Sequence, residues 1–432
     1  MNLILVELNE INFDIVKAYI DNGEKLLGFS AIIGPQLINT FAEENYDEIE
    51  PWIQWPSIHT GLNYHEHKIF RLGDIVKSSK KQFFEKVEHA GYTVGAISPM
   101  NASNMLEHPK FFIPDPWTKT PSDESFLSKR LTSALSQAVN DNSQSKLTLK
   151  TVINISIAFL ALVNPFRYFN MAWFALTSVR KPWRKALFLD KFLFEIFKTF
   201  YLRKKPNFST LFLNAGAHIQ HHYFFNSPYV NSNYLKNPSW YIAESEDPFL
   251  EMIKVYDEII QNIISIPDTE VIIATGLSQK PYSKIKYYYR FLNHEIFLKD
   301  IGVDFSAVVP RMTRDFLIIF KNTEDALDAE KKLNKVLVNN NEKLFKKIDN
   351  RGDTLFVVLT YSEEINDKIY FGFKEWTSPL SKYVTFVAIK NGEHQSKGFA
   401  YFSKGIMKFA PTPGSHVSKI HNTVLNFFNI SN

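Results

Sequence analysis

The stretch Phe208-Ser-Thr-Leu-Phe-Leu-Asn-Ala-Gly-Ala-His218 places a short apolar run directly before a polar frame. A run of this length and composition, bounded by polar residues, is typical of a buried strand. Leu3–Leu8 and Thr269–Thr275 are similar runs, and Phe249–Ile264 has the spacing of an amphipathic helix. Strands that alternate with helices imply a mostly parallel sheet covered by helices on both faces. The sequence therefore predicts an α/β fold.

Two segments interrupt this alternation. We expect a core made of residues 1–121, 207–313 and 385–432, a helical insertion at 122–206, and a small α/β insertion at 314–384. In the small insertion, Thr323 is expected to cap a helix that runs to about Val338. The turn Asn350-Arg-Gly-Asp353 is expected to close a hairpin, because its residues tolerate the backbone angles of tight turns.

Bulk composition excludes several classes of protein. The chain has 432 residues, a net charge of +4 and no cysteine. Disulfides and thiolate metal sites are thus excluded, and a metal would need His, Asp, Glu or Asn ligands. The charge is too mild to indicate nucleic-acid binding. The N-terminus starts in an apolar run without the pattern of a signal peptide, so we expect a cytoplasmic protein.

Residues 165–206 combine Lys and Arg with Trp and Phe at helical spacing. This composition is typical of helices that lie in a membrane interface, so we expect peripheral contact with the inner face of a membrane. The alternative is a soluble helical cap whose positive face attracts phosphorylated substrates. The preceding apolar run, 151–165, is too short to span a bilayer.

Polar groups that follow strands are candidates for a site, because the carboxyl ends of parallel strands meet at one edge of the sheet. A Glu with a His can perform acid–base chemistry without a metal, and exposed Trp rings can stack on a sugar or base, although buried packing is an equal alternative for them. The candidates for catalysis are Glu7, Glu50 and His218. The candidates for substrate contact are Glu10, Trp52, Gln54, Trp55, His59, Asn214, His221, His222, Ser278 and Gln279.

Several short frames resemble the alkaline phosphatase superfamily, especially its type I phosphodiesterase/nucleotide pyrophosphatase branch. They are Trp55-Pro-Ser-Ile-His-Thr-Gly-Leu62, Asn214-Ala-Gly-Ala-His218, Thr275-Gly-Leu277 and Gly392-Glu-His394. The resemblance implies hydrolysis of phosphoric esters with two metal ions and a nucleophilic Ser or Thr. Pro51 falls in the nucleophile's frame, although a shifted alignment would offer Ser57 or Thr60 instead.

The resemblance also implies metal ligands, and this chain keeps only some of them. Gly276 and Leu277 occupy the Asp-His frame of one ion, and neither side chain can bind a metal. His218, His394 and Asn214 remain as ligands for a single divalent cation; the alternative is that no metal is required. If the Asn214 frame continues as a helix, His218 and His222 share one face of it.

The resemblance and its gaps together predict an enzyme of glycan or glycoconjugate metabolism. We expect a phosphorylated or nucleotide-activated sugar, or a lipid-linked glycan, as substrate, in a transferase-like reaction that does not use two metals. One alternative is a phosphodiesterase or phosphatase with one residual metal. Another is a non-catalytic scaffold that keeps only the fold.

Overall fold

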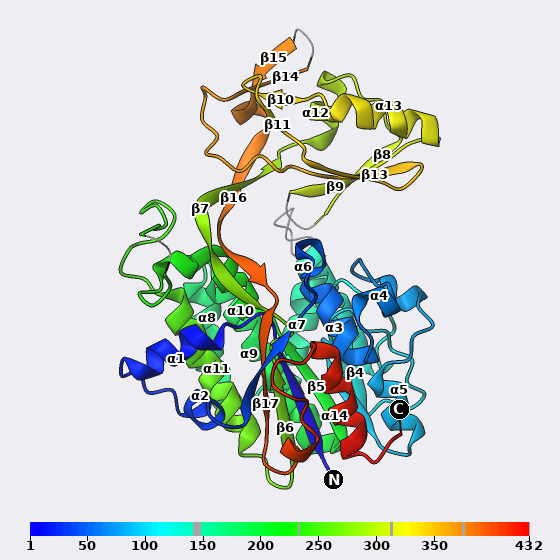
Figure 1. Ribbon diagram of the computed structural model, residues 1–432, viewed down its shortest axis with the longest axis vertical. Helices are drawn as coiled ribbons and strands as arrows, with labels where there is room; N and C mark the ends of the chain where they lie inside the picture. Colours follow the sequence, from blue (N-terminus) through cyan, green and yellow to red (C-terminus); the bar gives the residue numbers. More distant parts are fainter. Residues whose placement is uncertain (141–147, 232–233, 312–313, 374–375, 432) are drawn as a thin grey trace. The chain divides into compact units, whose positions relative to one another are not determined.

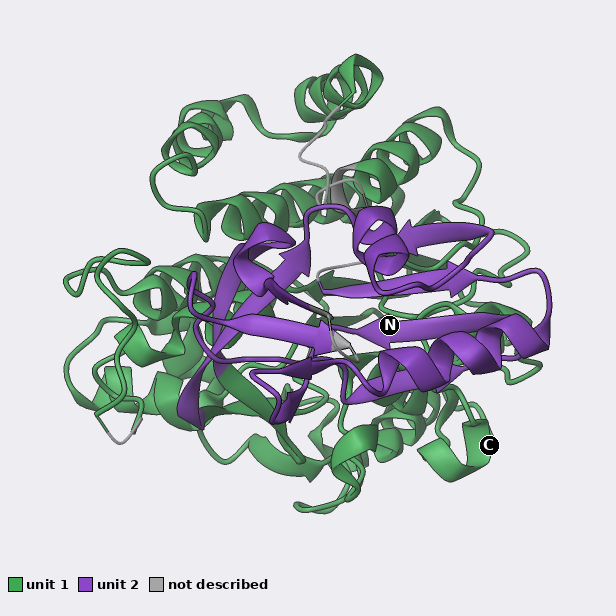
Figure 2. Ribbon diagram, turned by 90° about the horizontal axis from the view of Figure 1, so that it is seen from above, with its two compact units in different colours: residues 1–139, 146–281, 392–432 green, residues 140–145, 282–391 purple. Residues whose placement is uncertain are grey.

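The computed structural model describes residues 1–140, 148–231, 234–311, 314–373 and 376–431. Two compact units make up the chain (Figure 2). The first contains Met1–Val139, Lys146–Pro281 and Gly392–Asn432, and the second contains Tyr282–Asn391. Parts of the predicted segments, at 141–147, 312–313 and 374–375, lie outside the described residues.

A seven-stranded sheet in the order β2-β17-β6-β1-β5-β3-β4 forms the centre of the first unit (Figure 1). The run from β6 to β4 is parallel, and β17 is antiparallel to both of its neighbours. This arrangement confirms the predicted α/β class. The strands are β1 (Leu3–Leu8), β2 (Leu37–Phe41), β3 (Val94–Ile97), β4 (Phe111–Ile113), β5 (Phe208–Leu213), β6 (Glu270–Ala274) and β17 (Lys397–Phe402).

Helices cover both faces of this sheet, and each face has its own apolar core. Side chains alternate between the two faces along each strand, so every strand contributes to both cores. In β1, Ile4 and Val6 join one apolar core, while Leu3 and Leu5 join the other. The first core receives α1 (Phe13–Asp21), α2 (Leu27–Ile32), α6 (Phe126–Asn140), α7 (Leu149–Leu162), α8 (Tyr168–Thr177), α9 (Arg184–Lys204), α10 (Ala215–Tyr223) and α11 (Pro248–Ile264). The second receives α3 (Pro51–Thr60), α5 (Phe83–His89) and α14 (Ile420–Phe427), and α4 (Tyr64–His67) follows α3.

The predicted insertion at 122–206 is helical where it is described, but one of its helices belongs to the core. Phe192 and Phe197 of α9 are almost fully buried in the first apolar core. Eight residues from Asp190 to Phe197 form one buried run, so α9 is not amphipathic in the way its mixed composition suggested.

Two four-stranded antiparallel sheets, β12-β13-β9-β8 and β11-β10-β14-β15, form the second unit with two helices. The predicted hairpin is confirmed: Asp349 pairs with Phe356 across the turn. The elements are α12 (His294–Asp300), α13 (Thr323–Leu333), β8 (Ala307–Pro310), β9 (Asp315–Ile319), β10 (Leu337–Val338), β11 (Glu342–Lys343), β12 (Lys347–Asn350), β13 (Thr354–Val358), β14 (Tyr370–Phe373) and β15 (Trp376–Pro379).

Two details of this second unit differ from the sequence-based expectation. The cap of α13 is Asn322 rather than Thr323, because the Asn322 side chain accepts a hydrogen bond from the Asp325 amide at 2.9 Å. The unit also begins well before residue 314, since Phe291 and Phe297 pack in the same core as Phe316. Residues 282–313 were predicted to belong to the larger core.

Two long strands, β7 (Ser278–Phe291) and β16 (Val384–Gln395), pair as a two-stranded sheet. The boundary between the units falls within both strands. Gln279 at the start of β7 and His394 at the end of β16 therefore belong to the first unit.

Two buried histidines in the first unit are neutral. Burial lowers the pKa of His67 to about 4. Burial and the neighbouring Lys86 ammonium lower the pKa of His421 to about 3. The His421 ring is held by the Lys86 Nζ at 3.0 Å and by the His59 carbonyl at 2.9 Å.

We predict that the free energy of unfolding falls as the pH drops below about 6.5. Below this pH the unfolded chain binds protons at histidines that stay neutral in the folded state. The free energy of unfolding that is present above pH 6.5 is therefore lost as the pH falls, towards pH 4 for His67 and towards pH 3 for His421. Each histidine contributes up to about 1.4 kcal/mol per pH unit. Urea denaturation at pH 7.5 and 5.0 measures the effect. His421→Gln should flatten the pH dependence, and a wild-type slope kept in that variant would contradict the assignment.

Candidate metal centre

The turn after β1 sets the position of Glu10. Its φ of 64° lies in the left-handed region, which costs a non-glycine residue on the order of 1 kcal/mol. The Glu10 amide donates to the Thr275 carbonyl at 3.1 Å, which fixes the turn against the end of β6. Such strained residues concentrate at functional sites.

Three ligand-type atoms converge at this turn. The Glu10 Oε2 atom lies 3.1 Å from His394 Nε2 and 3.2 Å from His221 Nε2. The two imidazole Nε2 atoms are 3.2 Å apart. Glu10 is almost fully buried, while both histidines are partly exposed, so the cluster opens to solvent on the histidine side.

The donor set and its spacing fit a zinc-like cation. Two histidines and one glutamate are a known ligand set of catalytic zinc, with bonds of about 2.0–2.2 Å in a tetrahedral arrangement. That geometry separates the ligand atoms by roughly 3.3–3.5 Å. The observed separations, 3.1–3.2 Å, need an expansion of only a few tenths of an ångström.

Both imidazoles are oriented through their second nitrogen. His221 Nδ1 donates to the Gly392 carbonyl at 3.0 Å, and His394 Nδ1 lies 3.3 Å from Glu50 Oε2. Such contacts are typical around metal-binding histidines, because they fix the tautomer and leave Nε2 as the ligand atom. Gly392 is required here: a Cβ would lie 2.2 Å from the Gln279 Oε1 atom and 2.7 Å from the Gln220 carbonyl oxygen.

Amide side chains fix the Glu10 carboxylate from behind. Asn9 Nδ2 donates to Glu10 Oε1 at 3.0 Å, and Gln279 Nε2 donates to Glu10 Oε2. Burial raises the pKa of Glu10, but the positive charges of His394 and His221 outweigh it and hold the pKa well below its usual range. Burial lowers the pKa of His394, and Glu10 and Glu50 reverse this effect and raise it to about 10.

The helix that carries His221 is fixed at its N-terminus by a buried acid. Asp190 of α9 accepts hydrogen bonds from the Asn214 amide at 3.2 Å, the Ala215 amide at 2.8 Å and the Tyr256 hydroxyl at 2.6 Å. Burial nevertheless raises the pKa of Asp190 to about 6. These contacts pin the start of α10 and thereby the direction of its side chains.

The cluster differs from the predicted ligand set in two members. His394 is in the cluster, but His221 takes the place expected for His218. His218 lies beside His222 on the same helix face, with ring centroids 4.8 Å apart, as the spacing predicted. The Asn214 Oδ1 atom accepts from Asn9 Nδ2 at 2.8 Å, so this oxygen binds an amide within the network.

Glu7 and His59 are placed away from the cluster. Glu7 sits on the opposite face of β1 from Val6, and its Oε1 atom lies 3.1 Å from His59 Nε2. Both side chains are fully buried, so neither can meet a substrate from solvent. The structure thus joins Glu7, predicted for catalysis, and His59, predicted for substrate contact, in one buried pair.

The remaining candidates also have defined positions. Trp55 is fully buried and donates through Nε1 to Asn9 Oδ1 at 2.8 Å, so it supports the network and offers no stacking surface. Trp52 is half-buried and donates to the Phe70 carbonyl. Gln54 is buried and donates to the Glu48 carbonyl, and the Ser278 hydroxyl donates to the Lys397 carbonyl.

No activated hydroxyl is present among the residues that the motifs offered. Ser57 and Thr60 lie in α3 and donate to the carbonyls of Ile53 and Pro56. His67 Nδ1 accepts from the Ile69 amide, so its Nε2 carries the proton towards Ser57 and cannot act as a base for that hydroxyl. Pro51 begins α3, and Leu277 is fully buried.

Asn9 and Gln220 are the main contributors that the sequence did not single out. Asn9 links Trp55, Glu10 and Asn214, and Gln220 Nε2 donates to the Glu10 carbonyl at 2.8 Å. The position of Asn9 directly after the first apolar run was the available signal for it.

No protein-family model matches the chain, and no curated protein matches its sequence. Solved structures match it over nearly its full length. Phosphonoacetate hydrolase from Sinorhizobium meliloti is 12% identical, with 99% of this chain and 96% of that chain covered and a TM-score of 0.43. Murine ectonucleotide pyrophosphatase/phosphodiesterase 5 is 9% identical, with 100% and 96% covered and a TM-score of 0.38.

Alkaline phosphatase from the Antarctic bacterium TAB5 is 8% identical to the chain, with 100% of this chain and 98% of that chain covered and a TM-score of 0.41. These proteins are members of the superfamily that the sequence motifs resemble. At such identities and scores, the reaction has to be argued from the site residues.

We predict that the purified chain binds one Zn²⁺ through Glu10, His221 and His394. Calorimetric titration should give a stoichiometry of one, and Glu10→Gln, His221→Ala or His394→Ala should weaken binding by more than about 100-fold, because each removes one of three strong ligands. Glu50→Gln should weaken it by about 10–100-fold through the orientation of His394.

His89→Ala is the matched control, since His89 is an exposed imidazole on α5. It should bind zinc as the wild type does. His218→Ala separates the two ligand sets: a loss as large as that of His221→Ala would restore the set predicted from sequence and contradict the cluster described above.

Proposed function

We propose that the protein is an enzyme that acts on phosphoric esters with the help of a single divalent cation held by Glu10, His221 and His394. The main support is the convergence of these three ligand atoms to within 3.1–3.2 Å of one another. Both imidazoles are oriented for binding by a carbonyl and a carboxylate. The phosphoric-ester substrate class comes from the resemblance of the sequence frames.

A cation bound there would polarise a phosphoryl oxygen and favour ionisation of an attacking water or hydroxyl. Glu50 is about a quarter exposed and touches His394, so it can accept a proton at the mouth of the site while it orients the ring. Helix α3 begins directly after Glu50, so its N-terminal end lies beside the mouth. The positive end of a helix dipole favours an anionic substrate there.

The attacking group is supplied from outside the chain in this proposal. Pro51 has no hydroxyl, and those of Ser57 and Thr60 are bound to helix carbonyls. Water as the attacking group gives hydrolysis, whereas a second substrate's hydroxyl gives transfer. Transfer from a phosphorylated or nucleotide-activated sugar, as in glycan assembly, is the finer form of this proposal.

A metal-free transferase has less support than the sequence suggested. That mechanism relied on Glu7 or Glu50 as the base and on an aromatic platform. Glu7 and Trp55 are fully buried, so Glu50 is the accessible one of the two acids and Trp52 is the accessible one of the two rings. Glu50 in turn contacts a candidate ligand, which ties it to the single-cation site.

We predict slow turnover of bis-(4-nitrophenyl) phosphate, or of a nucleotide-sugar when an acceptor is present. Chelation should abolish the activity and Zn²⁺ should restore it. His394→Ala should remove it, whereas Glu50→Gln should lower kcat by about 10²–10⁴-fold if Glu50 takes the proton. His89→Ala should behave as the wild type.

Colorimetric release of nitrophenolate and chromatography of the sugar nucleotide measure the two reactions. Turnover that survives chelation would favour the metal-free transferase. Full cellular function of a chain carrying both Glu10→Gln and His394→Ala would instead indicate the non-catalytic scaffold.

A further inference from the structure

An exposed apolar surface covers α7, α8 and the turns around them, and we call it the α7–α8 surface. Phe166 and Phe169 are 94% and 84% exposed. They belong to a group of neighbouring exposed apolar side chains, and such a group indicates an interaction site, whereas single exposed apolar residues do not. Its large apolar members are Leu149, Val152, Ile153, Leu160, Phe166, Phe169, Trp173, Leu176 and Val179. They recur at helical spacing, so each helix turns one apolar stripe to the outside.

The N-terminal half of α7 has the reverse of the usual polarity, whereas Ala158 and Leu162 in its C-terminal half are buried as in an ordinary surface helix. Thr151 and Asn154 point inward, and Asn154 accepts a hydrogen bond from Arg130 at 2.7 Å. Val152 and Ile153 point outward. A surface helix normally buries its apolar stripe and exposes its polar one. The reversed order indicates that the outer face of α7 meets an apolar medium.

No single described helix is long and apolar enough to cross a membrane. Leu149–Leu162 and Pro165–Thr177 together are long and apolar enough to cross a membrane, but the chain bends by 119° between them. Helix α7 alone is roughly 21 Å long, short of the hydrocarbon thickness of about 30 Å. This geometry suits helices that lie along one leaflet.

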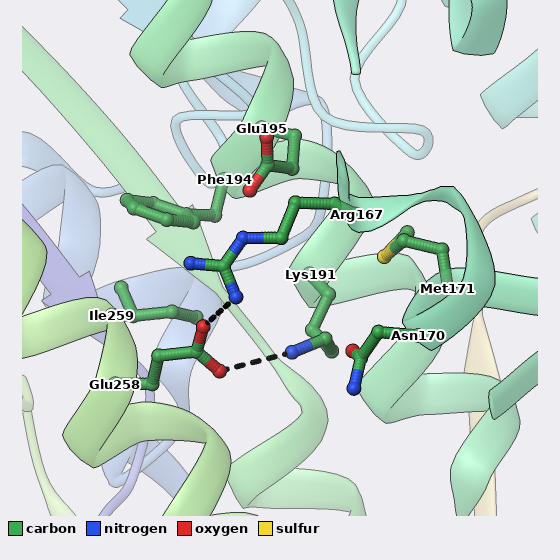
Figure 3. A pocket seen from close by; sticks show the side chains of 8 residues that line it. All are labelled: Arg167, Asn170, Met171, Lys191, Phe194, Glu195, Glu258 and Ile259. Atoms are coloured by element: carbon green, nitrogen blue, oxygen red, sulfur yellow. Dashed lines mark hydrogen bonds and ion pairs between the residues drawn. The ribbon is translucent and has the colours of Figure 1, made fainter. Parts of the chain in front are cut away.

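The elbow between the two helices is anchored to the core by charges (Figure 3). Arg167 and Lys191 both pair with Glu258 of α11, and the Lys191 contact measures 3.3 Å. Phe159 and Tyr168 close the inside of the elbow, with ring centroids 5.0 Å apart. Helices α7 and α8 are thus a fixed part of the first unit and expose their apolar stripes.

The charged residues of α7, α8 and the turns around them are all basic, and the acids that pair with some of them come from residues 246–258. The sequence has no Asp or Glu from Thr148 to Leu189. Lys150, Arg180 and Lys185 are exposed, and no ion pair of theirs occurs within the described part of the chain. An apolar face with an aromatic component and a basic rim matches the chemistry of an anionic lipid surface.

We propose that the α7–α8 surface inserts into the interfacial layer of a bilayer that carries anionic headgroups. Phe166, Phe169 and Trp173 enter the boundary between headgroups and acyl chains, while Arg180 and Lys185 contact the headgroups. A second copy of the chain fits less well, because a symmetric dimer would bring the same basic rims together. The sequence placed this contact on 165–206, but the middle of α9 is buried, so we propose 149–179 as the apolar surface and keep Arg180 and Lys185 as its basic rim.

Flotation of the full chain with lipid vesicles tests the proposal. The wild type should bind phosphatidylcholine vesicles containing phosphatidylglycerol and bind pure phosphatidylcholine more weakly. A triple variant, Phe166→Ser with Phe169→Ser and Trp173→Ser, should lose about 100-fold in partitioning, because binding scales with buried apolar area. Arg180→Glu with Lys185→Glu should lose at least about 30-fold on the anionic vesicles, since each basic residue contributes about 1 kcal/mol.

Trp240→Ser is the matched control, since Trp240 is 59% exposed outside this surface and Trp173 is 54% exposed within it. It should bind as the wild type does. An unchanged melting temperature confirms that the triple variant folds. The proposal is overturned if the wild type binds neither kind of vesicle or if the triple variant binds equally well. A wild-type dimer that the triple variant converts to a monomer, measured by light scattering, would assign the surface to a second copy.

Discussion

One carboxylate oxygen must sit between two imidazoles at the carboxyl end of β1, and much of the first unit serves that requirement. The left-handed turn at Glu10 aims the side chain, and the hydrogen bond to the Thr275 carbonyl holds the turn. Gly392 lets β16 approach α10 closely enough for its carbonyl to orient His221. A buried carboxylate without these two cationic partners would be costly, so Glu10 and the histidines depend on one another.

The fold could be predicted because its signals are local. Apolar runs bounded by polar residues identified β1, β5 and β6 to within a residue, and the hairpin turn identified β12 and β13. The site was harder, because it depends on where each element ends. Glu7 was predicted as the acid at the end of the first strand, but β1 continues to Leu8. Because side chains alternate along a strand, Glu7 points to the face of Leu3 and Leu5 and away from the face of Val6 and Leu8.

Helix orientation explains the other differences. His218 and His221 are three residues apart, so their directions differ by only about 60° around the helix axis, and it is His221 that contacts β16. Composition likewise could not separate α7, whose apolar side faces outward, from α9, which is buried. A sequence gives the spacing of a stripe, whereas the neighbouring elements decide which stripe is covered.

Helix α9 links two features that are far apart in sequence. Its Asp190 fixes the start of the helix that carries His221, and its Lys191 binds Glu258 beside the elbow of α7 and α8. Adjacent residues of one rigid helix thus hold both the candidate ligand helix and helices α7 and α8. A displacement of α9 along its axis would therefore disturb the Asp190 hydrogen bonds and the Lys191–Glu258 ion pair together.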